Sequence, residues 1–128
     1  MVWDVGANAG LYTQKFRDSL EAGGHVVAFE PSPRNGEALS EKFRGDGRVS
    51  VQVCALSDQP GQMFFEAATD GDGTRDHIVE YDTGLKVEVI TADILVFERG
   101  IPSPDFVKID VEGYELHVLN GMKRILQE

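Results

Sequence analysis

The sequence predicts an α/β fold built on a parallel sheet, and three observations carry this prediction. Short apolar runs alternate with segments whose apolar residues recur at helical spacing. Glycines stand where the first apolar run passes into the first of these segments, and a near-continuous apolar run follows late in the chain at 106–111. Strands that alternate with helices form parallel sheets through right-handed crossovers. A length of 128 residues predicts one domain, 1–128.

The first half of the chain is expected to form three strands separated by two helices. Glycines end the first helix, a proline opens the second, and three alternating valines mark the third strand. In chain order these elements are strand 1–5, helix 11–20, strand 25–29, helix 33–44 and strand 49–53.

The second half is expected to insert a hairpin before the sheet resumes. Strands 63–66 and 85–90, interpreted as antiparallel, flank a Gly/Asp-rich loop at 69–83. Strand 106–111 then returns to the parallel sheet. A closing helix over 114–126 is expected to bury one apolar face, formed by Leu116, Leu119, Met122 and Leu126.

The last parallel strand is expected to lie at an edge of the sheet. An unpaired apolar edge is an aggregation hazard, so natural proteins cover it. We therefore expect either that further strands beyond Glu128 are missing, which makes the domain truncated at its C-terminus, or that a partner covers the edge. A second copy of the chain, forming a homodimer, is a candidate for that partner.

The charge balance excludes two classes of partner. A net charge of −10, from 22 acidic and 12 basic residues, repels nucleic acid and anionic membrane surfaces. No apolar stretch approaches the ~20 residues that a membrane helix needs. The single cysteine, Cys54, has no partner for an internal disulfide, which favours a reducing, cytoplasmic compartment.

A glycine loop, 6–10, lies where the first strand passes into the first helix. Glycines there let the backbone turn sharply and approach a bound nucleotide. Asn8 takes the position of the second glycine of the dinucleotide-binding pattern, which favours a ligand without a pyrophosphate. A tight turn without a ligand is the alternative interpretation of this loop alone.

Glu30 adds an independent signal. It lies 20 residues past Gly10, at the expected carboxyl end of the second strand. In a parallel sheet this end opens beside the glycine loop, where a carboxylate can accept hydrogen bonds from both ribose hydroxyls. The alternative is a helix-capping residue. Together the two features indicate an adenosine-containing ligand.

The chain resembles the FkbM-type methyltransferases, which depend on S-adenosylmethionine (SAM) and have the class I, Rossmann-like fold with helices on both faces of the sheet. The Lys108–Gly113 string is the most specific of the motifs. The matching segments are 4–10, 29–33, 55–58 with Gly61, and 107–115 followed by 118–119 and Gly121. Two departures are the absence of the family's further strands and an unusually acidic loop at 70–74.

The resemblance implies SAM as cofactor and O-methylation of a hydroxyl on a small molecule or glycan. It implies that the glycine loop faces the methionine part of SAM, that Glu30 holds the ribose, and that Ala55 lies near the adenine. The candidate cofactor-binding residues are Asp4, Gly6, Asn8, Gly10, Glu30 and Ala55.

Asp110 and Glu112 are the candidate catalytic residues. In a continuing strand, residues two apart point to the same face, so both carboxylates are expected beside the methyl acceptor, one orienting it and one taking its proton. A shared divalent metal is an open alternative, although no third ligand is evident. The other alternative is that Asp110 caps the following helix and Glu112 adds negative charge to its first turn. Lys108 is expected to pair with Asp110 or to be paired for burial alone.

Two other functions stay open at this point. A non-catalytic adenosine-binding or interaction module is favoured by the missing C-terminal strands. A nicotinamide-dependent oxidoreductase is disfavoured by the absent second glycine and by the Lys108–Glu115 string. His117 lies opposite the expected apolar face of its helix and is interpreted as a solvated side chain.

Overall fold

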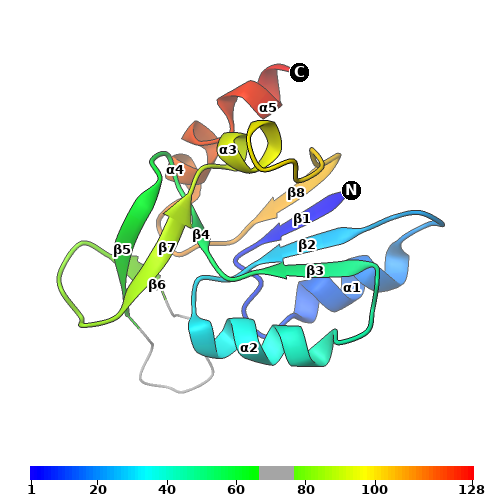
Figure 1. Ribbon diagram of the computed structural model, residues 1–128, viewed down its shortest axis with the longest axis horizontal. Coiled ribbons are helices and arrows are strands. Elements are labelled where there is room, and N and C mark those ends of the chain that lie inside the picture. Colours follow the sequence, from blue (N-terminus) through cyan, green and yellow to red (C-terminus); the bar gives the residue numbers. More distant parts are fainter. Residues whose placement is uncertain (67–76) are drawn as a thin grey trace.

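The computed structural model describes residues 1–66 and 77–128, which form two sheets with helices packed around them (Figure 1). The first sheet is wholly parallel, with the order β3-β2-β1-β8. Its strands are β1 (Val2–Val5), β2 (Val26–Phe29), β3 (Val49–Gln52) and β8 (Phe106–Ile109). The predicted parallel α/β sheet is therefore confirmed.

The register of this sheet aligns the carboxyl ends of its four strands. Val5, the last residue of β1, pairs with Phe29 on one side and with Ile109 on the other. Phe29 in turn pairs with Gln52 at the end of β3. The loops that leave these four strands consequently start along one line, where α/β sheets bind their ligands.

The second sheet contains the predicted hairpin. Its order is β4-β7-β5-β6, with β5 antiparallel to β7 and β4 parallel to it. The strands are β4 (Ala55–Leu56), β5 (Gly61–Glu66), β6 (His77–Val79) and β7 (Lys86–Ile90). The prediction of one loop over 69–83 is wrong at 77–79, where β6 pairs with β5. The acidic segment 70–74 lies outside the described residues.

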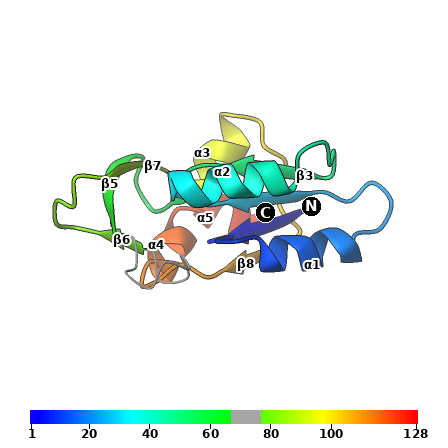
Figure 2. The same cartoon turned by 90° about the horizontal axis from the view of Figure 1, so that it is seen from below.

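Helices cover both faces of the parallel sheet, as expected. The two longest, α1 (Leu11–Ser19) and α2 (Pro33–Lys42), lie on one face, as Figure 2 shows from below. Successive strand residues point to opposite faces. Ala28 accordingly packs with Leu39 of α2, whereas Trp3 packs in the other core with residues of the later helices. These helices are α3 (Ala92–Phe97), α4 (Glu115–Asn120) and α5 (Lys123–Gln127).

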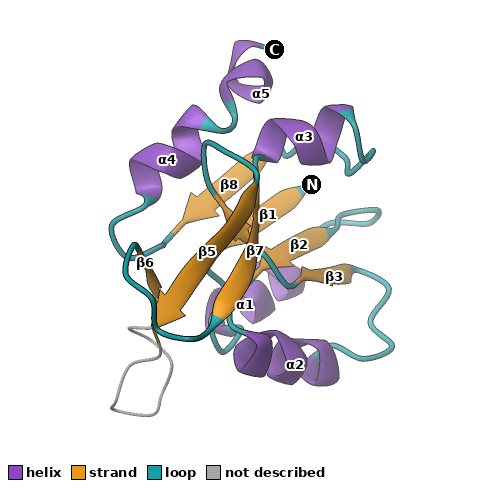
Figure 3. Cartoon of the chain, turned by 60° about the vertical axis from the view of Figure 1, so that its left-hand side comes forward, coloured by secondary structure: helices purple, strands orange, loops and turns teal. Residues whose placement is uncertain are grey.

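The prediction of a single closing helix over 114–126 is wrong. The segment forms two short helices, α4 and α5, with a break at Gly121 and Met122 (Figure 3). The buried residues are Val118 and Met122. Met122 of the predicted apolar face is therefore buried as expected, whereas Leu116, Leu119 and Leu126 of that face are exposed and Val118, which lies outside it, is buried.

Helix α3 was not expected from the sequence. It begins after Thr91, whose hydroxyl accepts a hydrogen bond from the backbone N–H of Ile94 at 3.1 Å, and Asp93 lies in its first turn. This is the usual chemistry of a helix N-terminus. A short helix with a capping threonine was therefore a readable signal at this position.

Strand β8 lies at an edge of the parallel sheet, as predicted. Within the described residues, β1 is its one strand neighbour. Phe106 of β8 is 54% exposed and meets Phe16 of α1 edge to face, with ring centroids 5.6 Å apart. A second copy of the chain at this edge stays a prediction. In the described part of the chain, no helix is long and apolar enough to cross a membrane.

Gly121, at the break between α4 and α5, packs closely against the segment after β4. A Cβ added at this position would lie 2.0 Å from the carbonyl oxygen of Ser57, so the backbone there has no room for a side chain. We predict that Gly121→Ala lowers the free energy of unfolding by about 1–3 kcal/mol, through overpacking. Gly47→Ala, where a Cβ meets nothing within 4 Å, is the control and should change it by less than about 0.5 kcal/mol. Urea unfolding measures both, and equal effects would contradict the explanation.

Candidate functional site

A pocket opens at the carboxyl edge of the parallel sheet. The space between its lining residues, with open solvent at the mouth included, is about 550 Å³. The ends of β1 and β2 and the segments that follow β1, β2, β3 and β8 contribute most of its wall, and the second sheet adds Ala55 and Leu56 of β4 and Ile78 of β6. The lining residues are Val5, Gly6, Asn8, Phe29, Glu30, Pro31, Cys54, Ala55, Leu56, Ile78, Asp110, Val111, Glu112 and Tyr114.

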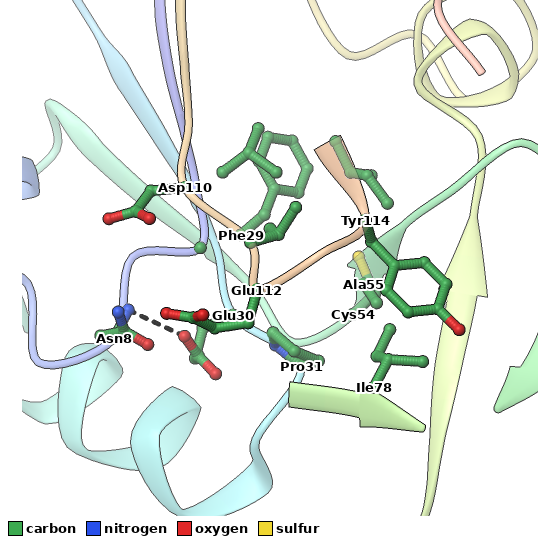
Figure 4. A pocket seen from close by; sticks show the side chains of 14 residues that line it. Asn8, Phe29, Glu30, Pro31, Cys54, Ala55, Ile78, Asp110, Glu112 and Tyr114 are labelled. Atoms are coloured by element: carbon green, nitrogen blue, oxygen red, sulfur yellow. Dashed lines mark hydrogen bonds between the residues drawn. The ribbon is translucent and has the colours of Figure 1, made fainter. Parts of the chain in front are cut away.

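The pocket has a polar end and an apolar end. Figure 4 shows Asn8, Glu30 and Asp110 on one side, and Ala55 and Tyr114 on the other. The apolar end continues into a hydrophobic cluster in which Ala55 and Ile78 are buried and Tyr114 packs against them. The two ends suit a ligand with one flat apolar part and one charged or hydroxylated part.

Glu30 is the most deeply buried of the carboxylates at this pocket, with 2% exposure. Its Oε2 accepts a hydrogen bond from the backbone N–H of Asn8 at 2.8 Å, and its Oε1 accepts one from the backbone N–H of Ser32 at 3.0 Å. The helix that follows is capped by Ser32, whose hydroxyl accepts from Asn35, so the alternative of Glu30 as the helix cap is wrong. The two backbone bonds fix the carboxylate in the pocket wall.

Gly6 lies where the glycine loop presses against the segment after β8. Its φ is +82°, and an added Cβ would lie 2.0 Å from the carbonyl oxygen of Asp110. Both constraints require glycine. The N–H groups of Gly6 and Ala7 each donate to the carbonyl oxygen of Phe29 at 3.0 Å. The loop is therefore held between the ends of β2 and β8.

Asp4 and Gly10 lie outside the lining of the pocket. Asp4 is fully buried: its Oδ2 accepts from the Thr13 hydroxyl at 2.6 Å, and its Oδ1 accepts from Lys108 Nζ at 3.0 Å. Gly10 is the N-cap of α1, with φ +87°. Both residues thus stabilise the two ends of the glycine loop. Direct contact of either with a cofactor stays a prediction.

Asp110 and Glu112 both line the pocket and are exposed to solvent. β8 ends at Ile109, so they lie beyond the strand whose alternation predicted their common face. Helix α4 begins at Glu115 after Tyr114 and has no side-chain cap, so the interpretation of Asp110 as a helix cap is wrong. Lys108 Nζ lies 3.9 Å from Asp110 Oδ2, the expected ion pair. Among the described residues, no group of three or more His, Cys, Asp or Glu side chains is placed to hold a metal ion.

Of the apolar wall, the sequence predicted Ala55 but neither Tyr114 nor Ile78. Burial, followed by the charges of Glu80 and Asp58, raises the pKa of Tyr114, whose ring lies 4.8 Å from that of His117. His117 is exposed, as expected. Tyr114 directly follows the specific Lys108–Gly113 string, which was a usable signal. Ile78 comes from the inserted hairpin, and no motif marks it.

A glycine loop after the first strand, an acidic residue after the second and a pocket between them define a Rossmann-like α/β protein of the methyltransferase type. The family model of the methyltransferase FkbM domain matches residues 4–128, and the chain belongs to this family.

Three curated relatives match nearly the whole chain. The hexuronic acid methyltransferase AglP of Haloferax volcanii is 38% identical over 99% of the chain and 52% of its own length. The 2-O-methyltransferase NoeI of Sinorhizobium fredii is 28% identical, over 98% and 58%. The 31-O-demethyl-FK506 methyltransferase FkbM of Streptomyces tacrolimicus is 31% identical, over 96% and 59%. The chain thus spans between half and three fifths of the length of these relatives.

A solved structure has the same fold. The methyltransferase FkbM from Methylobacillus flagellatus KT superimposes with a TM-score of 0.69 at 19% identity. The match covers 98% of this chain and 29% of the other. It supports the arrangement of the two sheets and their helices.

The reactivity of the Cys54 thiol tests whether this part of the pocket wall is shielded from solvent. Burial, helped by the nearby Glu88 carboxylate, raises the pKa of its thiol from 9.0 to about 12. Near pH 8 this shift lowers the reactive thiolate fraction about a thousandfold. We therefore predict that iodoacetamide labels the folded chain about a thousandfold more slowly than the urea-unfolded chain, by mass spectrometry. Cys54→Ser gives the background, and folded-state labelling at nearly the unfolded rate would contradict the prediction.

Proposed function

We propose that the protein transfers a methyl group from SAM to a hydroxyl group of a small molecule or sugar. The observation that carries the proposal is the buried Glu30 carboxylate, held by the backbone of the glycine loop at the carboxyl edge of the sheet. Membership of the FkbM methyltransferase family supports the reaction class.

The residues of the pocket fit SAM part by part. A carboxylate offers two oxygens with about four acceptor sites, which suits the two hydroxyls of a ribose. The apolar end beside Ala55 and Tyr114 suits a flat adenine. The polar end, with the backbone of Gly6 and Asn8, suits the charged amino-acid part. Three carboxylates in the lining, Glu30, Asp110 and Glu112, also favour a cation over a neutral or anionic ligand.

The acceptor is expected beside Asp110 and Glu112. When bound, SAM would supply a methyl group that is already activated by attachment to its sulfonium, which leaves as a neutral thioether. The chain's own task is to align the acceptor oxygen and to remove its proton. Both carboxylates reach solvent at the pocket, where they can orient a hydroxyl group and accept its proton.

Three observations support the proposed kind of acceptor, a cytoplasmic compartment and the exclusion of nucleic acid as a substrate. The relatives are named for a hexuronic acid, a 2-O position and a 31-O position, which supports an oxygen acceptor on a sugar or metabolite. The single, buried thiol fits the reducing conditions of the cytoplasm. The net charge of −10 disfavours nucleic acid as a substrate.

Calorimetric titration with S-adenosylhomocysteine and with NAD tests the cofactor. We predict saturable binding of the first ligand only. Glu30→Gln, which removes a charged acceptor, is expected to raise the Kd by about 10- to 100-fold.

Glu37→Gln is the matched control, because Glu37 lies exposed on α2, and its Kd should equal that of the unchanged chain. Circular dichroism confirms that each variant is folded. Binding of NAD in preference, or no binding by a folded chain, would contradict the proposed cofactor. Binding of S-adenosylhomocysteine without methyl transfer to any hydroxyl acceptor would instead favour an adenosine-binding module.

A further inference from the structure

Lys108 joins three segments of the structure that meet behind the pocket. Its ammonium lies on the α1 side of β8, and the side chain is 17% exposed. The group makes four contacts: Asp4 Oδ1 at 3.0 Å, the Gly6 carbonyl oxygen at 3.4 Å, Asp110 Oδ2 at 3.9 Å, and the Tyr12 ring centroid at 4.7 Å.

The contact with Asp4 fixes the position of the ammonium. A fully buried carboxylate is strongly destabilising unless it is paired and hydrogen-bonded. The Thr13 hydroxyl satisfies one oxygen of Asp4, and Lys108 supplies the opposite charge at the other. Because the Asp4 carboxylate cannot reach water, its ion pair with Lys108 holds the Lys108 ammonium in place.

The other two polar contacts connect this anchored charge to the pocket. Gly6 and Asp110 both line the polar end, whereas Lys108 is absent from the lining. The backbone of Gly6 already presses against the carbonyl of Asp110. An ammonium bound to the Gly6 carbonyl and close to the Asp110 carboxylate therefore sets the relative position of the glycine loop and the segment after β8.

We propose that Lys108 is a positioning residue for the polar end of the cofactor pocket, the end that receives the amino-acid part of the cofactor. The inference rests on the proposed function. Lys108 acts through Gly6 and Asp110 and does not touch the cofactor. The apolar end is built by Ala55 and Ile78 of the second sheet and by Tyr114, which precedes α4, and Lys108 does not belong to this cluster.

Two probes separate this role from a general structural one. S-adenosylhomocysteine occupies both ends of the pocket, and adenosine lacks the amino-acid part. We predict that Lys108→Met raises the Kd of S-adenosylhomocysteine by about tenfold, the effect of losing a hydrogen bond to a charged group. The Kd of adenosine should change by less than about twofold. Lys123→Met, at an exposed lysine of α5, is the matched control and should change neither.

Lys108→Met leaves the buried Asp4 unpaired and can prevent folding. The double variant Asp4→Asn with Lys108→Met removes both charges and avoids this penalty. It is expected to show the same selective loss. Equal weakening of both probes, or no weakening of either, in a folded variant would overturn the proposal. If the unchanged chain binds neither probe, the proposed function itself is wrong. If the unchanged chain binds both probes and only the selective loss is missing in the variant, the role of Lys108 alone is wrong.

Discussion

The arrangement of the loops at the carboxyl edge of the parallel sheet depends on the buried carboxylate of Asp4. A carboxylate with no access to water needs a partner at each oxygen, and those partners come from α1 and β8. Thr13 and Lys108 lie 9 and 104 residues away in the chain. Satisfying one side chain therefore fixes the first strand, the helix after the glycine loop and the edge strand relative to one another.

This constraint explains how loops from distant parts of the chain form one pocket. Val5, Phe29 and Ile109 end level in the sheet, so the residues after them start from a common line. The loop then passes so close to Asp110 that only glycine fits at position 6. Glu30, bound by the N–H of Asn8, completes the polar end. A small number of short-range contacts thus places a carboxylate, a glycine loop and an apolar wall around one space.

The sequence predicted what depends on local pattern and missed what depends on packing between distant segments. The parallel sheet and the antiparallel hairpin follow from strand and helix periodicity, and the position of Glu30 beside the loop follows from sheet geometry. Helix periodicity also suggested one closing helix, but the segment divides at Gly121 and Met122, where Gly121 packs against Ser57. Ile78 entered the pocket from a hairpin without a motif, and the Asp4–Lys108 pair joins residues whose contact no local pattern encodes.

We propose that the carboxyl edge of the parallel sheet binds the cofactor with Glu30 at its ribose. A crystal structure of the chain with S-adenosylhomocysteine tests this most directly. We expect both ribose hydroxyls to lie within about 3.0 Å of the Glu30 carboxylate oxygens, with the adenine beside Ala55. A ligand bound elsewhere, or in this pocket with its ribose turned away from Glu30, would show that Glu30 does not hold the ribose.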